Sequence, residues 1–270
     1  MSGFTYATSH RIEIVEPGLL RKDLSEDALI GDAADAKPAL VHDPCREPAV
    51  YRHVLGPAGV GPRCIDSGRD WIVVEYVDAP VLWQVGNLAT WVAVAAWVAG
   101  MHRRLASVPA GHAPLVVHDA SLLAAWRDRA AAAGATSAVL AAHERASDRL
   151  LALPATVVHG ELYASNILVN GGVEVWPVDW ELAGLGPAVL DVAALTAGSG
   201  LPRGTRVAMA RAYFDAAGRR PSEWPDWCAD LDAARLHLCV QWLGWAPGWS
   251  PPAGHRHDWL GEATLLAGRL

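Results

Sequence analysis

Three polar residues in one segment of the chain have the types and the spacing that metal binding and proton transfer require. Glu161 and Asn166 lie in the loop "HGELYASN", which apolar runs flank on both sides. Asp179 ends the next apolar run, and the turn at 170–172 favours a hairpin that brings Asp179 back beside Asn166. An amide oxygen and a carboxylate are hard ligands suited to Mg²⁺. Glu161, close to them, can accept a proton from a hydroxyl group.

Two charged residues nearer the N-terminus extend this set. Lysine is rare in the chain, because Lys22 and Lys37 stand against twenty arginines, so each lysine is a candidate for a specific role. Lys22 falls on the second strand of a hairpin predicted over 11–24, and Glu47 falls in the first turn of the next predicted helix. There the two can form an ion pair. A lysine for phosphate, its glutamate, a metal-binding Asn/Asp pair and a base are the parts of a phosphoryl-transfer site.

The elements that must position these residues are predicted from turn signals and apolar patterns. Pro17-Gly18 marks the turn of the first hairpin, and Trp71–Val77 gives the strongest strand signal in the first half. Asp43 suits an N-cap and Pro44 a first helical position. The pattern further predicts a loop at 56–62, helices at 90–105 and within 120–151, strands flanking the loop within 157–169, a strand at 173–180, and a mostly helical remainder from 185.

This order of elements predicts an α+β fold with two lobes. Residues 1–77 are expected to form a small N-terminal nucleotide-binding lobe, and 78–90 a hinge or connector. Residues 91–270 are expected to form a larger C-terminal lobe that carries the catalytic loop and the acceptor site.

Composition narrows the class of protein. With 270 residues, of which 52% are apolar and 19% charged, the chain is long and apolar enough for a globular core. Its net charge of −7 argues against nucleic acid as the main partner. The longest apolar run is too short to span a bilayer, and no signal peptide is recognisable. Four cysteines without a disulfide or metal pattern predict reduced thiols and a cytoplasmic location.

The motifs make the sequence resemble the aminoglycoside phosphotransferase family, whose members share a protein-kinase-like fold. The resemblance rests on "HGELYASNILV", on "PVDWELAGLGPAVLDVA" and on the order of Lys22, Glu47 and "VVEYV". It covers most of the chain and is most specific over 157–195. It implies a Mg²⁺-dependent phosphotransferase that uses ATP, with a β-rich N-lobe shortened at its start and a larger helical C-lobe.

The resemblance also implies roles for the catalytic residues. Asn166 and Asp179 would bind Mg²⁺, and Asp191 would brace the catalytic loop. Glu161 would orient or deprotonate the hydroxyl of the acceptor, which is a small molecule or a peptide side chain. His159 is more typical of a structural residue that bonds the loop backbone.

Nucleotide binding is implied for a second group of residues. Lys22 would hold the α and β phosphates, and Glu47 would orient Lys22. The backbone of the hinge, from Glu75 to Val77, would bind the base, which leaves GTP open beside ATP. The hydroxyl and backbone N–H groups of Thr8 and Ser9 would face the phosphates.

Two departures from the family pattern leave two hypotheses open. Glu161 stands where the family has aspartate, and a displacement of about 1 Å at a reacting group can cost about a hundredfold in rate. No GxGxxG motif precedes the first predicted strand. The first hypothesis is an active phosphotransferase. The second is a weak or inactive nucleotide-binding pseudokinase that serves as a scaffold for a protein partner in a biosynthetic complex.

Three further features are interpreted as structural. Trp242, Trp245 and Trp249 have a spacing more typical of a helix core than of an acceptor pocket. The "HRHD" stretch at 255–258 is interpreted as a solvated loop rather than a zinc site. The acidic stretch at 222–234 is interpreted as the start of a helix.

Overall fold

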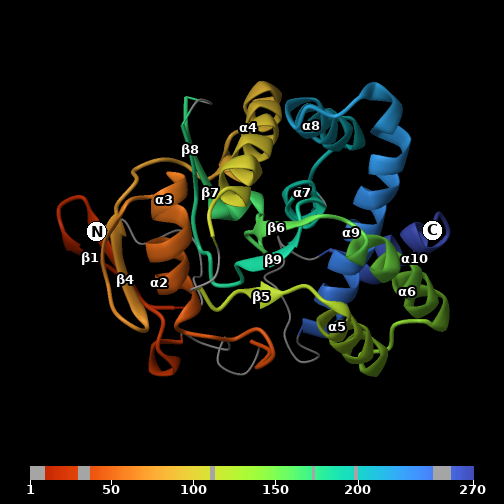
Figure 1. Ribbon diagram of the computed structural model, residues 1–270, viewed down its shortest axis with the longest axis horizontal. Helices are drawn as coiled ribbons and strands as arrows, with labels where there is room; N and C mark the ends of the chain where they lie inside the picture. Colours follow the sequence, from red (N-terminus) through yellow and green to blue (C-terminus); the bar gives the residue numbers. More distant parts are fainter. Residues whose placement is uncertain (1–9, 30–36, 110–112, 172–173, 198–199, 246–256) are drawn as a thin grey trace.

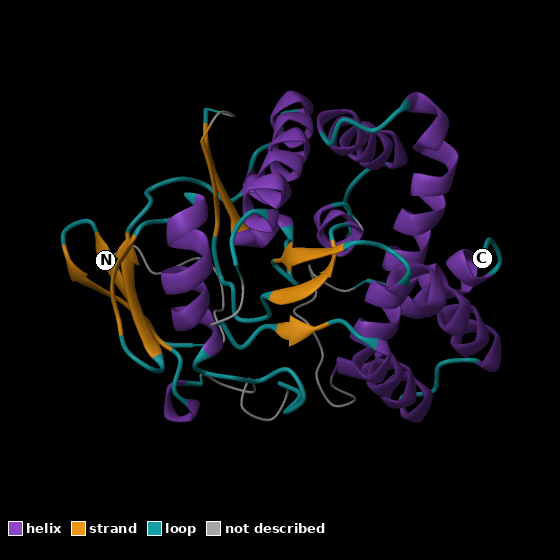
Figure 2. Ribbon diagram, in the orientation of Figure 1, coloured by secondary structure: helices purple, strands orange, loops and turns teal. Residues whose placement is uncertain are grey.

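The computed structural model describes residues 10–29, 37–109, 113–171, 174–197, 200–245 and 257–270. A small part built on a four-stranded sheet lies beside a larger, mainly helical part, as Figure 1 shows by chain position and Figure 2 by element type. The α+β class and the division into a sheet-based and a helical part agree with the prediction.

The small sheet is antiparallel and places Lys22 between two other strands. Its strands run in the order β1-β2-β4-β3 and comprise β1 (Ile12–Glu16), β2 (Leu19–Asp23), β3 (Cys64–Ser67) and β4 (Trp71–Glu75). The hairpin predicted over 11–24 is confirmed, with Gly18 at a φ of +83° in its turn, and β3 and β4 form a second antiparallel pair. Lys22 pairs with Ile12 on one side and Ile72 on the other, and its side chain is buried.

A helical segment packs against this sheet and carries Glu47. It runs through α2 (Arg46–Val50), the π-helical turn η2 (Tyr51–Leu55) and α3 (Gly56–Ala58), after a 3-10 turn η1 (Glu26–Ala28) earlier in the chain. The predicted start at Asp43 and Pro44 is wrong by two residues. The Asp43 carboxylate accepts a hydrogen bond from the Cys45 amide at 2.9 Å, so it stabilises a turn before the helix. The predicted loop at 56–62 begins later, because α3 extends to Ala58.

The connector after β4 is bonded to the catalytic part of the chain. It contains the 3-10 turn η3 (Leu82–Gln84) and leads into α4 (Leu88–Ala106), whose N-cap Asn87 accepts a hydrogen bond from the Ala89 amide. Val81 forms a bridge with Leu168, and the Val169 amide donates to the Pro80 carbonyl at 3.0 Å. The connector therefore fixes the strand that follows the catalytic loop.

Helices form most of the larger part. After α4 these are α5 (Ala120–Ala132), α6 (Ser137–Leu151), α7 (Val189–Leu195), α8 (Arg203–Ala216), the 3-10 turn η5 (Pro221–Glu223), α9 (Trp224–Trp245) and α10 (Trp259–Ala267). The predicted helical stretch at 120–151 is two helices. Gly134 adopts a φ of +92° between them, and the Thr136 hydroxyl caps α6. Helix α9 packs against α5, α6, α7 and α10.

Two small sheets lie between the four-stranded sheet and the helices, near the centre of Figure 1. One contains β5 (Val116–Val117), β9 (Gly184–Pro187) and β6 (Ala155–Val158), and the other pairs β7 (Ile167–Asn170) with β8 (Glu174–Pro177). The catalytic loop, with the 3-10 turn η4 (Ala164–Asn166), joins β6 to β7. Because these strands belong to different sheets, both ends of the loop are held independently.

One apolar cluster extends through both parts. It includes Tyr51 and Leu55 from the helical segment beside the sheet, and Leu162 and Trp180 from around the catalytic loop. Because the side chains of this one cluster pack against each other across both parts, they fix the position of one part relative to the other. None of the helices in the described ranges is long and apolar enough to cross a membrane.

Candidate functional site

The catalytic loop holds Glu161 and Asn166 through hydrogen bonds within the loop. The Asn166 side-chain Nδ2 donates to the Glu161 carbonyl at 2.9 Å. This bond sets the direction of the amide, so Oδ1 points away from the loop backbone, with the Ser165 hydroxyl at 3.3 Å. The Tyr163 amide also donates to the Glu161 carbonyl at 2.7 Å. The loop is therefore a tight turn that presents a carboxylate and an amide oxygen.

Asp191 at the start of α7 braces the beginning of this loop, as predicted. Its buried carboxylate accepts hydrogen bonds from the His159 amide at 2.8 Å and the Gly160 amide at 3.0 Å. His102 Nε2 lies 3.0 Å from the same carboxylate. Burial alone would raise the pKa of Asp191, but the contact with His102 and the bond from the His159 amide lower it below its ordinary value.

His159 is structural, as interpreted from the sequence. Its Nε2 lies 2.9 Å from the Val178 carbonyl, and its Nδ1 lies 3.3 Å from the Glu161 amide. This pattern matches a neutral ring in which Nε2 donates and Nδ1 accepts. Burial lowers the pKa of His159, which favours the same neutral form. The ring thus ties the catalytic loop to the strand before Asp179.

Asp179 follows β8 at a sharp change in backbone direction. It is the one non-glycine residue of the described chain with a positive φ, at 69°. The Val178 amide donates to the Asn166 carbonyl at 2.9 Å, so Asp179 is adjacent to Asn166, as the predicted hairpin requires. Aspartate tolerates the left-handed region better than most side chains. This backbone conformation turns the carboxylate toward the small sheet.

Lys22 and Glu47 form the predicted ion pair. Lys22 Nζ lies 2.7 Å from Glu47 Oε2, and it also pairs with Asp179. The other carboxylate oxygen of Glu47 accepts a hydrogen bond from the Trp180 amide at 3.0 Å. Burial opposes the charge of Lys22, but Asp179 and Glu47 outweigh it and raise the pKa of the ammonium group. The structure thus brings Lys22, Glu47 and Asp179 together from three distant segments.

Two residues of the site, His10 and Glu181, were missed by the sequence analysis, and Lys37 was singled out only by the rarity of lysine. Glu181 Oε1 lies 2.7 Å from Lys22 Nζ and 2.8 Å from His10 Nδ1, and its Oε2 pairs with Lys37. Burial, with the charges of Lys22 and Lys37, lowers the pKa of His10 to about 4, so the ring is neutral at pH 7. The rarity of lysine was the one sequence signal that could have pointed to Lys37.

The donor set fits a divalent cation. Carboxylate oxygens of Glu47, Asp179 and Glu181 lie within 4.8 Å of one another. With Glu161, four carboxylates face two ammonium groups, which leaves a formal charge of 2 − 4, or −2, when all are ionised. Asp179 is the accessible member, because 34% of its side chain is exposed against 2% for Glu47 and 8% for Glu181. Asp179 is therefore the carboxylate of this set that a cation could reach most easily, and the Oδ1 atom of Asn166 is a second oxygen of the kind that Mg²⁺ binds.

Glu161 has the electrostatic environment of a group that exchanges protons near neutral pH. Burial, and then the charge of Asp179, raise the pKa of Glu161 to about 7, while the two lysines oppose the shift. A carboxyl group with a pKa near 7 can accept a proton from a hydroxyl group. The glutamate therefore has suitable chemistry in the place where the family has aspartate.

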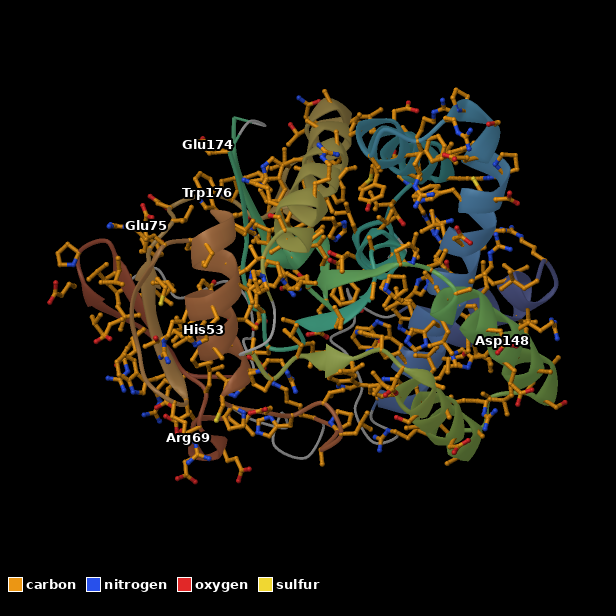
Figure 3. All side chains as sticks on the ribbon, in the orientation of Figure 1. His53, Arg69, Glu75, Asp148, Glu174 and Trp176 are labelled. Carbon is orange, nitrogen blue, oxygen red and sulfur yellow. The ribbon has the colours of Figure 1, made fainter. Side chains whose placement is uncertain are left out.

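The remaining predicted nucleotide contacts do not lie beside Lys22: the hinge residues Glu75 and Val77 follow the far end of β4, and two others lie outside the described residues. Glu75 ends β4 with an exposed side chain, visible at the rim of the sheet in Figure 3, and its amide donates to the Arg63 carbonyl at 2.9 Å. The Val77 carbonyl accepts a hydrogen bond from the Ala79 amide at 3.1 Å. Thr8 and Ser9 lie outside the described residues.

The tryptophans singled out in the sequence pack mainly against other aromatic rings. Trp242 stacks on Trp259 with ring centroids 5.4 Å apart, and its Nε1 donates to the Tyr163 hydroxyl at 2.8 Å. Trp245 stacks on Trp126 at 5.7 Å. These contacts agree with a packing role, and Trp249 lies outside the described residues.

Two other stretches have structural partners. In the "HRHD" stretch, residues 255–256 lie outside the described residues, His257 pairs with Glu262, and Asp258 caps α10. The acidic stretch at 222–234 begins α9, as interpreted from the sequence.

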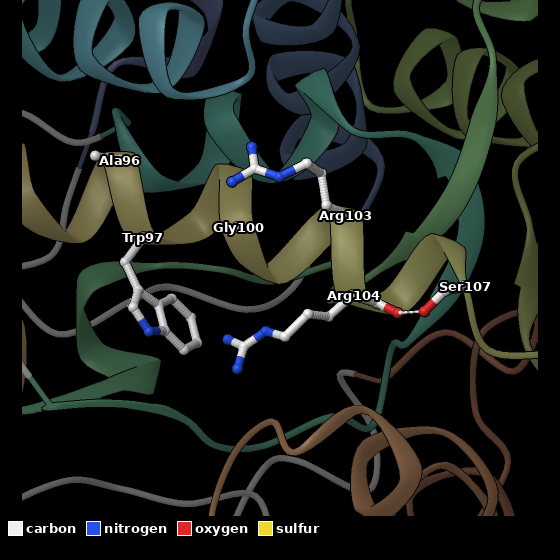
Figure 4. Close-up of a pocket in the computed structure, with 6 residues that line it drawn as sticks. All are labelled: Ala96, Trp97, Gly100, Arg103, Arg104 and Ser107. Atoms are coloured by element: carbon white, nitrogen blue, oxygen red, sulfur yellow. Dashed lines mark hydrogen bonds between the residues drawn. The ribbon is translucent and has the colours of Figure 1, made fainter.

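A shallow pocket on α4 is separate from this cluster of charged residues. Figure 4 shows that Trp97 and Arg104 extend from one side of the helix and Arg103 from the opposite side. The Arg104 guanidinium lies 5.2 Å from the centre of the Trp97 ring, and Arg103 donates to the Ala216 carbonyl. The pocket contains none of the predicted catalytic residues.

Replacing Gly160 by alanine is expected to lower the free energy of unfolding by about 2–3 kcal/mol. Gly160 has a φ of +86°, and an added Cβ would overlap the Leu182 carbonyl oxygen. Urea unfolding of the variant against wild type measures this loss. Gly59→Ala is the matched control, since Gly59 has a φ of +62° but open space around it, and only the backbone cost of about 1–2 kcal/mol applies. Equal losses in the two variants would contradict the close contact at Gly160.

Solved structures with similar folds include kinases of small molecules. A choline/ethanolamine kinase family protein from Mesorhizobium loti superposes with a TM-score of 0.65 and 16% identity, over 99% of this chain and 88% of that one. The GDP complex of aminoglycoside 2'-phosphotransferase-IIIa gives a TM-score of 0.65 and 11% identity, over 98% and 90% of the two chains. These likenesses confirm the two-lobed, protein-kinase-like fold.

A third similar structure contains both a nucleotide and an acceptor. It is the aminoglycoside phosphotransferase APH(3'')-Id from Streptomyces rimosus in complex with ADP and streptomycin, with a TM-score of 0.56 and 18% identity over 88% of this chain and 94% of that one. No curated protein sequence matches the chain. The profile of the phosphotransferase enzyme family matches residues 35–230, which is well over half of the chain. The chain therefore belongs to the phosphotransferase enzyme family.

Proposed function

We propose that this protein transfers the γ-phosphoryl group of ATP to a hydroxyl group of a small molecule, with Mg²⁺ as cofactor. The observation that carries the proposal is the meeting of the Lys22–Glu47 ion pair with Asp179, next to the loop that holds Glu161 and Asn166. A lysine with a raised pKa, a metal-binding carboxylate and a proton acceptor are together what this transfer requires.

The nucleotide would lie between the small sheet and the catalytic loop. Lys22 would bind phosphate oxygens while Glu47 keeps its ammonium group in place. The backbone from Glu75 to Val77 would bind the base, and Thr8 and Ser9 would approach the phosphates. We assign 1–77 to the nucleotide-binding lobe, 78–90 to the hinge and 91–270 to the catalytic lobe on this basis. The ADP and GDP complexes of structurally similar proteins support a nucleoside triphosphate as donor.

Asn166 and Asp179 would hold Mg²⁺, which neutralises charge on the phosphates when it is bound. The chain prepares both ligands in advance. The bond from Nδ2 to the Glu161 carbonyl points the Asn166 oxygen outward, and the backbone at Asp179 directs its carboxylate toward Lys22. Such fixed ligands need little rearrangement on binding, which is how a protein stabilises a charged transition state.

Glu161 would orient the acceptor hydroxyl and take its proton as the oxygen attacks the γ-phosphorus atom. Its main-chain carbonyl is held by two hydrogen bonds, and the preceding glycine and histidine are fixed by Asp191. The extra methylene of glutamate is therefore attached to a rigid backbone. This rigidity lets the longer side chain reach a defined position, which favours an active enzyme over a scaffold.

A Glu161→Gln variant is expected to lose about a hundredfold in phosphoryl transfer, because glutamine cannot accept the proton. The measurement is Mg²⁺-dependent ADP formation from ATP with choline, ethanolamine and aminoglycosides as trial acceptors, run in parallel with GTP. The dissociation constant of ADP is expected to stay within about threefold of wild type, since Glu161 acts on the acceptor.

Glu144→Gln is the matched control, because Glu144 is exposed on α6 and pairs only with Arg127 among the contacts of the described chain. Its rate is expected to equal that of wild type. The proposal fails if wild type binds nucleotide but transfers no phosphate to any acceptor or to water. That result would support the pseudokinase reading, with the chain acting as a scaffold.

A further inference from the structure

The only two lysines of the chain meet at one carboxylate. Lys22 Nζ lies 2.7 Å from Glu181 Oε1, and Lys37 pairs with Glu181 Oε2. The chain has 22 lysine and arginine residues in all, and the other twenty are arginines. Lysine differs from arginine as a compact point charge with three donors on a flexible stem, which suits it to the rounded oxygen surface of a phosphate chain. The two lysines therefore form a pair of compact cations within the proposed phosphate site.

The segment that carries Lys37 is anchored to the site by Arg46. One Arg46 nitrogen, Nη1, donates to the Val41 carbonyl at 2.6 Å and to the Glu181 carbonyl at 2.7 Å. The Arg46 Nε donates to the Pro114 carbonyl at 2.8 Å. Because Val41 is four residues after Lys37, these bonds fix the approach of the segment to the same residue that Lys37 contacts. The contact between Lys37 and Glu181 is thus held by the hydrogen bonds of Arg46 to the backbone as well as by the attraction between opposite charges.

Lys37 is a buried member of the cluster of charged residues around Glu181, because its side chain is only 11% exposed. Burial lowers the pKa of its ammonium group, while the charges of Asp179 and Glu161 act in the opposite direction. Glu181 is shared with Lys22 and His10, so it does not depend on Lys37 for its own hydrogen bonds. An ammonium group has three donors, and Glu181 is the one hydrogen-bonding partner of Lys37 Nζ among the residues that the structure describes. An anion that enters beside Asp179 would accept from the other donors.

We propose that Lys37 is a second phosphate-binding lysine, which contacts the β-phosphate of the bound nucleotide beside Lys22 and, in a triphosphate, the γ-phosphate as well. This inference rests on the proposed function. If the ion pair between Lys37 and Glu181 only stabilised the fold, removing it would not change the affinity for the phosphate groups of the nucleotide. A lysine that only fills the place of a cation among the carboxylates would compete with Mg²⁺ and weaken nucleotide binding. The three roles therefore differ in what happens when the charge of Lys37 is removed.

The test is calorimetric titration of wild type, Lys37→Met and Lys37→Arg with ADP in the presence of Mg²⁺, and with adenosine, which has no phosphate. Lys37→Met is expected to raise the dissociation constant of ADP about tenfold or more, the loss that follows when a hydrogen bond between charged groups is removed. Adenosine binding is expected to be unchanged. Lys37→Arg keeps a charge that can bind phosphate and is expected to lose less affinity for ADP than Lys37→Met.

Arg103→Met serves as the control for general electrostatics, because Arg103 is an exposed cation on α4 outside the site. Its ADP affinity is expected to equal that of wild type. Unchanged or tighter ADP binding by Lys37→Met overturns the inference, and so does an equal loss of ADP and adenosine binding. If wild type binds no ADP at all, the proposed function itself is wrong, which separates that failure from a failure at Lys37.

Discussion

An Asp179→Asn variant is expected to lose about a thousandfold in the rate of phosphoryl transfer, with little change in the free energy of unfolding. A metal ligand at the transferring phosphoryl group contributes several kcal/mol of charge stabilisation, and about 4 kcal/mol corresponds to a thousandfold. Asparagine keeps an oxygen of the same shape but removes the charge. The measurement is ADP formation at saturating acceptor over a range of Mg²⁺ concentrations, where the variant is expected to need more Mg²⁺.

The fold is expected to tolerate this change for two reasons. The Asp179 backbone adopts a φ of 69°, a region that asparagine tolerates well. Lys22 keeps Glu47 and Glu181 as partners at 2.7 Å each. Asp179→Ala would add backbone strain to the loss of the charge, which makes asparagine the cleaner probe.

The matched control for Asp179 is Asp128→Asn. Asp128 is 71% exposed on α5 and pairs with the neighbouring Arg127. Its rate and its unfolding midpoint are expected to equal those of wild type. A rate within about tenfold of wild type for Asp179→Asn would mean that Asp179 is not a metal ligand in the transfer. A large drop in the unfolding midpoint would instead place its main role in the fold.

The residues that the sequence predicted best are those whose spacing is set by local structure. Asn166 and Asp179 are close because β7 and β8 pair as antiparallel strands, a pairing that the glycines at 171–172 predict from the sequence. Asp191 was located through the family motif that surrounds it. In each case a short stretch of chain contains both the element and the residue that it positions.

Contacts between distant segments were harder to predict. His10 and Glu181 are 171 residues apart, and Lys37 and Glu181 are 144 apart. Nothing in the sequence near Lys37 indicates that Arg46 ties this segment to the backbone of Glu181. These contacts depend on how the small sheet and the catalytic loop pack together. The sequence therefore showed that Lys37 was unusual but not where its ammonium group lies.

The predicted and observed boundaries of an element differ where one side chain could serve two structural roles. Aspartate is a residue type typical of an N-cap, which favoured a helix start at Asp43. Its carboxylate instead accepts a hydrogen bond from the Cys45 amide two residues on, and the helix begins at Arg46. Arg46 is the first residue of this helix, and its guanidinium donates to the Val41 and Glu181 carbonyls. Bonds to such distant residues cannot be predicted from the local sequence.

Asp191→Ala is expected to lower the free energy of unfolding by about 3–5 kcal/mol, because it leaves two buried backbone N–H groups and His102 without their acceptor. Since domains are stable by only about 5–15 kcal/mol, this is a large fraction of the total. Urea unfolding at pH 7 measures the loss. Asp215→Ala is the matched control, because Asp215 is 55% exposed on α8, and its unfolding midpoint is expected to match that of wild type.

The pH dependence of the Asp191→Ala loss identifies the carboxylate as its cause. The folded protein holds the pKa of Asp191 below its ordinary value, which is about 3.9 in an unfolded chain. Its stabilisation is therefore complete above that value and is lost as the pH falls through it toward the folded pKa. The gap between wild type and variant is expected to be constant from pH 7 to about pH 5 and to narrow at lower pH. A gap that widens on acidification would show that a group other than the Asp191 carboxylate holds the catalytic loop.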